Sequence, residues 1–294
     1  QLRELDPAHY RSDTLTLTYD GEEGLEAAIK RLCDEAEDLV KNKSTVILIL
    51  TDRQIHQGLL VIPAAMAVGA VQKRLVDQQL RCDSNIIVET ASVRDSHQYA
   101  VLLGLGATAI YPYLAFETIE QLVEQGQIKL SARDAVVNYR EGINKGLLKI
   151  LSKMGISTIA SYRCAGLFEV IGLNDNIMKL CFSDLPSRIK GADFTDIEQD
   201  CINLARKAFL PHQKMSHGGL LKYVHGEEYH AFNPNVVNYI QRAVQNGNYD
   251  DYRKFADEVN NRPIAMLRDL LVLKDDCEAI KLSQVESSNE MFKR

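Results

Sequence analysis

The sequence predicts an α/β fold of parallel-sheet βα repeats resembling an incomplete (β/α) barrel, with a C-terminal helical extension. Short runs of β-branched and apolar residues alternate with stretches of helical periodicity, an order typical of βαβ units with parallel strands. After about Pro211 the strand-like runs stop and only helical patterns follow. The expected strands are residues 45–50, 85–89, 108–111, 157–161 and 178–182.

The first two helices are predicted by apolar stripes. Pro63 can begin the second helix, because its missing N–H would be unpaired in a first turn in any case. Ala64, Val68, Val71 and Leu75 then align on one face. The first helix carries an apolar residue at every third or fourth position, so one face should meet the sheet. This stripe consists of Leu25, Ile29, Leu32, Ala36 and Leu39.

Later helices are predicted from their ends. Residues 131–154 form one long helix, and Gly155 stands where a left-handed residue would end it. Thr195 and Glu198 have capping-box spacing ahead of another apolar stripe. Two further helices are expected over residues 234–247 and 250–261, the second ended by a proline.

The domain organisation follows from these patterns. We expect an α/β central domain body over residues 1–211, a helical extension over 212–273, and a charged linker over 274–294. The chain has no initiator methionine, so it is expected to be a piece of a longer protein. The last segment would then lead toward a further domain.

Composition excludes several classes of protein. The 294 residues are 46% hydrophobic with a net charge of −6 and no long basic run, which argues against nucleic-acid binding. The longest apolar runs fall well short of the roughly 20 residues that span a bilayer. Six scattered cysteines without a C-x-x-C pair indicate reduced thiols, hence a cytoplasmic location.

Three motifs could carry chemistry, and each has a simpler interpretation. Residues 104–109 match G-x-G-x-x-A, but a helix precedes and a strand follows, which reverses the order in dinucleotide-binding sites. Cys164 follows an expected strand, where a nucleophile could sit, yet no base is evident. Four histidines, with Glu227 and Glu228, could ligate a metal but lack the spacing of zinc helix motifs. The histidines are His212, His217, His225 and His230.

Charged residues after the first two expected strands are stronger candidates. Asp52 and Arg53 follow one strand, and Glu89, Arg94 and Asp95 occupy the equivalent place after the next. The carboxyl edge of a parallel sheet often forms the functional crevice, but such residues also form structural ion pairs and helix caps. Both interpretations stay open.

Two glycines form a smooth patch on the long helix. Gly142 and Gly146 lie four residues apart, so another backbone could approach them closely. Packing within the domain is favoured over docking of a separate partner.

Long blocks of the sequence resemble the central region of the large subunit of glutamate synthase, most closely the bacterial NADPH-dependent type. They extend over nearly the whole chain, which makes them more specific than any short motif. The blocks are residues 51–53, 62–70, 87–91, 110–118, 142–158, 161–164 and 218–230.

This resemblance implies a multidomain enzyme that makes L-glutamate from L-glutamine and 2-oxoglutarate. A glutaminase domain would release ammonia into a tunnel leading to a barrel with FMN and a three-iron cluster. FAD and NADPH would belong to a small subunit. The resemblance places no cofactor and no catalytic residue in the central domain. The expected partners are the glutaminase and FMN-binding domains of the same chain and the small subunit.

The expected role is therefore a non-catalytic domain that connects two active sites and helps form the ammonia tunnel. The loop carrying Thr51, Asp52, Arg53, Gln54 and His56 is the candidate tunnel or interface segment. Two alternatives stay open. One is a self-contained barrel enzyme using Asp52, Glu89 and Cys164, and the other is a metabolite-sensing module.

Overall fold

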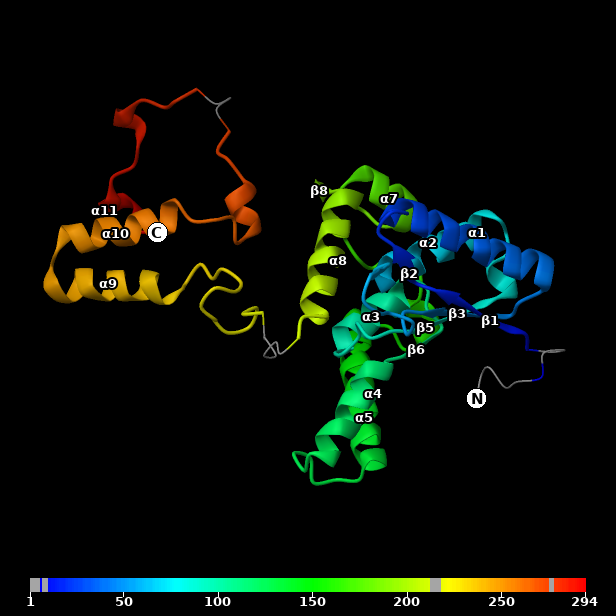
Figure 1. Cartoon of the computed structure of the whole chain (residues 1–294). Coiled ribbons are helices and arrows are strands. Elements are labelled where there is room, and N and C mark those ends of the chain that lie inside the picture. Colours follow the sequence, from blue (N-terminus) through cyan, green and yellow to red (C-terminus); the bar gives the residue numbers. More distant parts are fainter. Residues whose placement is uncertain (1–5, 7–9, 212–217, 275–277) are drawn as a thin grey trace. The chain divides into compact units, whose positions relative to one another are not determined.

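The computed structural model describes residues 6, 10–211, 218–274 and 278–294. The chain divides into two compact units, Gln1–Pro211 and His212–Arg294 (Figure 1). The first unit contains the sheets, and the described part of the second contains helices and short turns.

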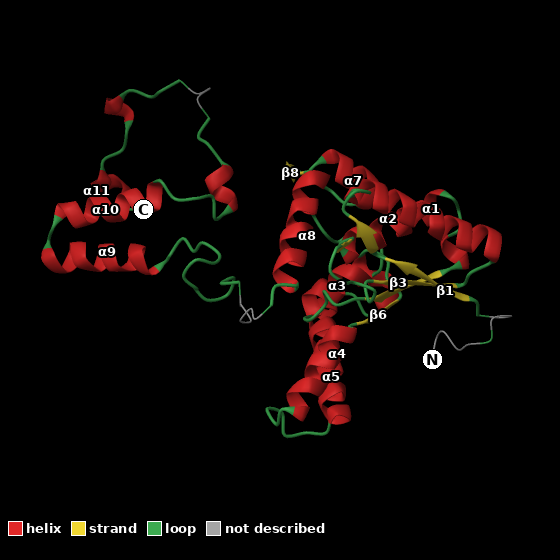
Figure 2. Ribbon diagram, viewed as in Figure 1, coloured by secondary structure: helices red, strands yellow, loops and turns green. Residues whose placement is uncertain are grey.

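A four-stranded parallel sheet forms the centre of the first unit (Figure 2). Its strands are β1 (Ser12–Thr16), β3 (Ile47–Thr51), β5 (Asn85–Glu89) and β6 (Ala109–Tyr111), which lie in that order. The predicted parallel βα architecture is confirmed, and the sheet stays open in the described residues. β1 is a strand that the sequence pattern did not reveal.

Two small two-stranded sheets flank the central one. β2 (Thr18–Asp20) pairs with β4 (Leu59–Val61) in antiparallel fashion. β7 (Ile171–Leu173) pairs with β8 (Ile189–Ala192) in parallel. These four strands also went unpredicted, because runs of three or four residues give too little periodicity to identify.

Amphipathic helices bury their apolar stripes against the sheet. All five stripe residues of α1 (Leu25–Lys43) are buried, as predicted. α2 (Ala64–Asp77) begins after Pro63, buries Val68, Val71 and Leu75, and packs beside α1 (Figure 1). α3 (Ser96–Gly104) packs on the long helix α5 (Ala132–Met154).

A helical hairpin follows the last strand of the main sheet. It consists of α4 (Tyr113–Glu124) and α5 (Ala132–Met154), which contact each other. As predicted, Gly155 ends α5, with φ 69°. The Ser131 side chain caps its start, so the helix begins one residue later than expected. Gly146 contacts Ser96 at the start of α3, so this glycine allows two helices to pack closely. The site of Gly142 is open.

Two predicted strands are wrong. Residues 157–161 enter α6 (Ile159–Tyr162), whose first turn is capped by the Thr158 side chain. Residues 178–182 belong to α7 (Asp175–Cys181) and its end, where Ile177 and Cys181 are buried at helical spacing. A short apolar run is compatible with a strand or a helix, and in both places a side-chain cap stabilises the helix.

The predicted capping box of the next helix is displaced by two residues. α8 (Phe194–Ala208) begins one residue earlier than Thr195, and its cap is Asp193. The Asp193 carboxylate accepts hydrogen bonds from the backbone N–H groups of Thr195 and Asp196, while the Asp193 N–H donates to the Asp196 carboxylate. Aspartate caps as well as threonine does, so the residue type alone was ambiguous.

The second unit contains a helix pair. α9 (Pro234–Asn246) is capped by Asn233 and ended by Gly247, and α10 (Tyr249–Asn260) packs against it. Both predicted helices are confirmed. The remaining described elements are 3-10 turns at Leu267–Leu270 and Leu282–Gln284, and α11 (Ser288–Met291). No helix in the described part of the chain combines the length and apolarity required to cross a membrane.

Candidate functional site

The parallel register brings the ends of β3 and β5 together. Thr51 pairs with Glu89 in the sheet, and the Thr51 hydroxyl donates a 2.7 Å hydrogen bond to Glu89 Oε2. Thr51 is 3% exposed and Glu89 is 5% exposed. A buried carboxylate is therefore present at the carboxyl edge, where sequence analysis expected charged residues.

Asp52 connects the two loops that follow these strands. Its carboxylate accepts a 2.6 Å hydrogen bond from the Thr90 hydroxyl and 3.1 Å bonds from the backbone N–H of Ala91. Its own N–H donates to the Glu89 carbonyl at 3.2 Å. Because donors satisfy the carboxylate in a buried setting, the structure favours the structural interpretation of Asp52.

The Arg53 side chain extends from the buried start of the loop toward α4. Its Nη2 donates a 2.6 Å hydrogen bond to Glu117 Oε1, and its Nη1 lies 3.4 Å from Glu89 Oε1. The guanidinium also covers the Tyr113 ring at 4.8 Å from the centroid. Burial, and then the neighbouring Asp52 carboxylate, raise the pKa of the Tyr113 hydroxyl. Arg53 nevertheless keeps 45% of its side chain exposed.

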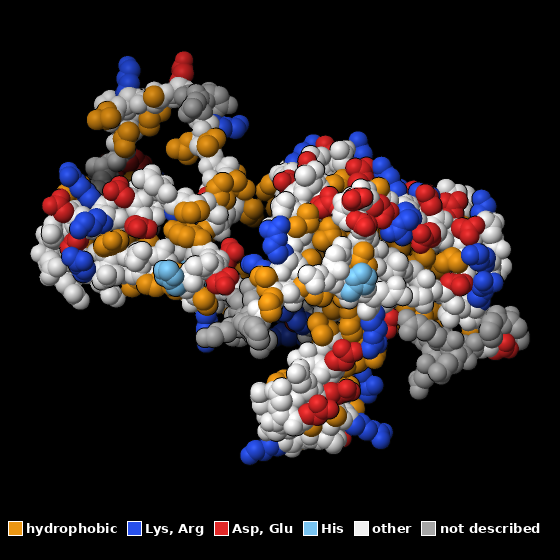
Figure 3. Space-filling model, viewed as in Figure 1, with side chains coloured by type: hydrophobic (Ala, Val, Ile, Leu, Met, Phe, Trp, Pro, Cys, Tyr) orange, Lys and Arg blue, Asp and Glu red, His pale blue; other side chains and the backbone are white. Residues whose placement is uncertain are grey.

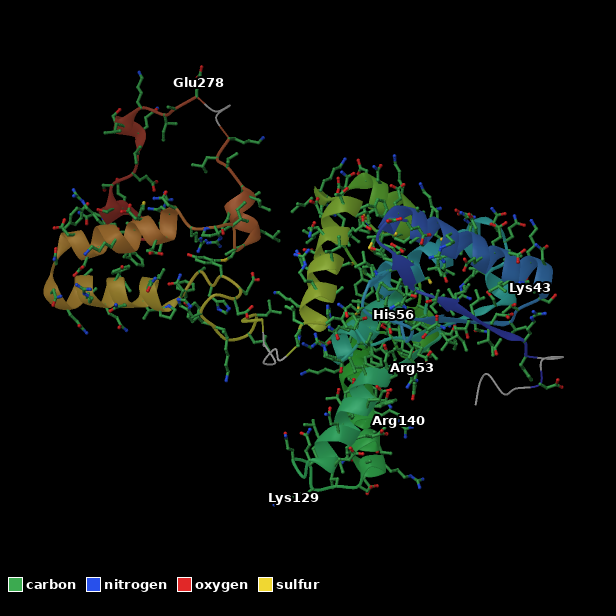
Figure 4. All side chains as sticks on the ribbon, in the orientation of Figure 1. Lys43, Arg53, His56, Lys129, Arg140 and Glu278 are labelled. Carbon is green, nitrogen blue, oxygen red and sulfur yellow. The ribbon has the colours of Figure 1, made fainter. Side chains whose placement is uncertain are left out.

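The tip of the same loop faces solvent. Gln54 and His56 are exposed, and Figure 4 places His56 near Arg53 on the same side of the unit. Ile55 N–H donates to the Asp52 carbonyl, and Leu59 N–H donates to the His56 carbonyl, so turns order the loop. In residues 51–56, the first two residues are thus buried, and the tip of the loop is exposed and ordered by hydrogen bonds.

An apolar cavity of about 470 Å³ lies next to this loop. Its walls come from the loop, the start of α2, α3 and α8. Polar residues at the wall include Asp52, Ser92 and His97. Hydrophobic side chains reach the surface around α8 (Figure 3), where Leu204 is 68% exposed. The cavity is a hollow with few polar groups, a composition suited to packing rather than to acid–base chemistry.

The other two charged candidates lie at the start of α3, where the Asp95 side chain and the Arg94 backbone make structural contacts. Asp95 caps α3 by accepting hydrogen bonds from the N–H groups of His97 and Gln98. The Arg94 carbonyl accepts a 2.9 Å hydrogen bond from the Tyr139 hydroxyl of α5. These contacts fix the start of α3 and do not join the cluster around Glu89.

The glycine motif is a helix-to-strand turn, as expected. α3 ends at Gly104 and β6 begins at Ala109. Gly106 has φ 120°, a conformation that L side chains rarely adopt. No helix begins in this turn to present N–H groups to a phosphate.

Cys164 lies far from Asp52 and Glu89. It shares a cavity with Asn85, the first residue of β5, whereas Glu89 is the last. Four steps along a strand separate these ends by about 13 Å. Burial raises the pKa of the Cys164 thiol, and Arg81 and Arg163 act against that rise. The three residues of the self-contained enzyme alternative are therefore not brought together.

No group of three or more potential metal ligands occurs among the described residues. His212 and His217 lie outside them. His230 hydrogen-bonds through its ring to the Gly219 carbonyl. The described cysteines include the buried Cys33 and Cys181 and the exposed Cys164, and all are free thiols. An iron–sulfur cluster needs several converging thiolates, and the described cysteines form no such group.

Sequence reasoning missed Tyr113 and Glu117 as members of the cluster. Both lie on α4, directly after β6, and are spaced by one helical turn. The same edge rule that selected Asp52 could have selected them.

Comparisons with known proteins identify the family. Residues 1–174 match the family model described as the glutamate synthase central domain. The chain is 33% identical over 274 residues to the Glutamate synthase [NADPH] large chain of Bacillus subtilis, covering 92% of this chain and 18% of that protein. It is 36% identical over 276 residues to the same-named chain of Azospirillum brasilense, covering 93% and 18%.

A ferredoxin-dependent relative is equally similar. The chain is 34% identical over 298 residues to the Ferredoxin-dependent glutamate synthase of Pyropia yezoensis, covering 97% of this chain and 19% of the relative. The chain thus spans about a fifth of the length of these relatives, and both electron-donor types occur among them. The matched region includes the parallel sheet, the 51–56 loop and α5. The chain belongs to the glutamate synthase central domain family.

Proposed function

We propose that this chain connects the glutaminase and FMN-binding domains of a glutamate synthase large chain without catalysing a reaction itself. The family match over residues 1–174 carries this proposal. The intact enzyme would make L-glutamate from L-glutamine and 2-oxoglutarate. Within the chain, residues 1–211 would form the central body, 212–273 a helical extension, and 274–294 a linker toward the FMN-binding domain.

The hydrogen bonds of Asp52 and Glu89 at the carboxyl edge of the sheet support a non-catalytic role. The Asp52 carboxylate is engaged by Thr90 and Ala91, and Glu89 is engaged by Thr51 and Arg53. A general base needs an available lone pair near its substrate. These carboxylates instead hold the loops in place.

The cofactors would be bound elsewhere in the intact enzyme. We assign FMN and a three-iron cluster to the rest of the large chain, and FAD and NADPH to a small subunit. NADPH is our choice of electron donor, in line with the two bacterial relatives. The free thiols of the described cysteines agree with a reducing compartment, so we place the enzyme in the cytoplasm.

Residues Thr51, Asp52, Arg53, Gln54 and His56 would form part of the ammonia tunnel wall or of a domain interface. A wall excludes bulk water by close packing and needs only a few fixed polar groups. The buried start of the loop supplies fixed polar groups, and the exposed tip and the neighbouring apolar cavity supply surfaces for packing.

Purification of the 294-residue chain tests the proposal. We expect a colourless protein that binds no FMN and shows neither glutaminase nor glutamate-forming activity, while the full-length enzyme assayed in parallel shows both. Stoichiometric flavin or iron–sulfur absorbance in the purified chain would overturn the proposal.

A further inference from the structure

A second cavity, of about 400 Å³, lies at the amino edge of the sheet. We call it the amino-edge pocket. It lies at the start of β5, opposite the cluster around Glu89. The polar residues in its wall include Arg81, Cys82, Ser84, Asn85, Arg163 and Cys164.

Arg81 is fixed in this wall by neutral acceptors. Its Nη1 donates a 2.6 Å hydrogen bond to the Ser84 carbonyl, and its Nη2 donates a 3.0 Å bond to the Gly106 carbonyl. Its Nε donates to the Gln72 side chain. These contacts use three of the five N–H groups of a guanidinium. Among the described residues, no carboxylate forms an ion pair with Arg81.

Arg163 reaches the same pocket from the end of α6. Its Nη1 donates a 3.0 Å hydrogen bond to the Thr108 hydroxyl, which donates at 3.3 Å to Asn85 Oδ1. Within the described part of the chain this guanidinium also forms no ion pair. Burial, and to a smaller degree the neighbouring Arg163, lower the pKa of Arg81. The wall of the pocket therefore carries two guanidinium groups, neither of which is ion-paired in the part of the chain that the structure describes.

Ser84 provides an independent observation. It is 2% exposed, and its hydroxyl has no hydrogen-bond partner among the described residues. A buried polar group without a partner is uncommon and loses stability. The Asp184 carboxylate also raises the pKa of the Cys164 thiol, but it forms no ion pair with either arginine in the described residues.

We propose that the amino-edge pocket binds a small molecule through an oxyanion group, phosphate or carboxylate, held between Arg81 and Arg163. This site goes beyond the proposed function, which needs no ligand in this domain. Guanidinium groups suit oxyanions because their planar donors match two oxygens at once. The unused N–H groups of both arginines supply such donors, and the ligand would neutralise their paired charge.

The cavity volume exceeds that of a single inorganic ion, so the ligand should be a small metabolite with an anionic end. Phosphate and carboxylate share the required chemistry. Orthophosphate and succinate therefore serve as the two probes, and chloride at equal ionic strength measures the contribution of salt alone.

Thermal unfolding of the 294-residue chain with each probe tests the site. We expect saturable stabilisation by one or both oxyanions beyond that by chloride, and the stronger probe identifies the group. Arg163→Gln should weaken the apparent affinity at least ten-fold. This variant is preferred to Arg81→Gln because, among the described residues, the Arg163 side chain donates one hydrogen bond and the Arg81 side chain donates three. Arg133→Gln, on the exposed first turn of α5, is the matched control and should retain binding.

Alkylation of Cys164 by neutral iodoacetamide gives a second readout. The two arginines favour the Cys164 thiolate, so an oxyanion between them should slow modification of this residue, measured on its peptide by mass spectrometry. Arg163→Gln should slow it without any oxyanion, and circular dichroism checks that the variant is folded. The proposal is overturned if the oxyanions stabilise no more than chloride, or if Arg163→Gln and Arg133→Gln bind them equally well.

Discussion

The hydroxyl of Thr90 donates a 2.6 Å hydrogen bond to Oδ2 of Asp52, with the two residues 0% and 4% exposed. This contact joins the loops after β3 and β5, which lie 38 positions apart in the sequence. Since the Ala91 N–H donates to the same carboxylate, one side chain fixes the conformation of both loops.

Asp52→Asn should therefore destabilise the protein. The amide has one acceptor oxygen instead of two, so a buried donor loses its partner at a cost of about 1 to 3 kcal/mol. Chemical unfolding measures the loss. Asp200→Asn, on the exposed surface of α8, is the control and should change stability by no more than about 0.5 kcal/mol. Equal stability of the two variants would contradict the structural role of Asp52.

Leu32→Ala tests the core. Leu32 is 0% exposed in the stripe of α1, so the free energy of unfolding should fall by about 2 to 5 kcal/mol. Leu147 is half-buried against the same core, so Leu147→Ala should lower the free energy of unfolding by less than Leu32→Ala does. Leu148→Ala, at a site 64% exposed, should lie within about 0.5 kcal/mol of the parent. A small loss for Leu32→Ala would mean that α1 does not pack as described.

The start of α8 provides a test between two capping residues. Asp193→Ala should cost about 0.5 to 2 kcal/mol, because two backbone N–H groups lose their acceptor. Thr195→Ala should have little effect, since Thr195 is exposed and lies inside the first turn. If urea unfolding gives the larger loss for Thr195→Ala, the helix begins where the sequence pattern placed it.

Alkaline pH should reduce stability through buried thiols. Burial raises the pKa of Cys33 from 9.0 to about 11. The unfolded chain therefore loses this proton at lower pH than the folded chain, so the contribution to stability is complete below pH 9 and is lost as pH approaches 11. Each such thiol gives a slope of about 1.4 kcal/mol per pH unit in that window.

Unfolding curves at pH 8, 9 and 10 in reducing buffer measure this slope. Cys33→Ala should make the slope shallower, and Cys82→Ala, at an exposed thiol, should leave it unchanged. Identical slopes for the two variants would show that Cys33 is not the titrating group.

Helices with strong end signals could be predicted from the sequence. The apolar stripe of α1, the glycine that ends α5, and the proline and glycine at the two ends of α9 are local signals, and the structure confirms them. The strands predicted over residues 157–161 and 178–182 were wrong, because these apolar runs are too short to distinguish a strand from a helix. Their caps, Thr158 and Asn174, decided the outcome.

The candidate site was partly predictable for a related reason. Sequence position placed Asp52, Arg53 and Glu89 at one sheet edge, and in the structure both Asp52 and Arg53 hydrogen-bond to Glu89. Their partners are distant in sequence: Arg53 binds Glu117, which is 64 positions away. Periodicity carries no information about such pairs, so the structural role of Asp52 became visible only in the fold.

The proposal that residues 51–56 link two active sites is tested in the full-length enzyme carrying Arg53→Gln. Arg53 is preferred to Asp52 because its side chain is 45% exposed, and its ion pair with the exposed Glu117 contributes only about 0 to 1 kcal/mol to stability. Its other partner, the buried Glu89, keeps the hydrogen bond from the Thr51 hydroxyl. A change in coupling can then be separated from a loss of folding. Arg133→Gln serves as the control.

The decisive measurement is the ratio of glutamine hydrolysis to NADPH oxidation. We expect Arg53→Gln to raise this ratio above that of the parent, with ammonia-dependent glutamate synthesis preserved and Arg133→Gln unchanged. An unaltered ratio in Arg53→Gln would contradict the account and leave the loop with a structural role only.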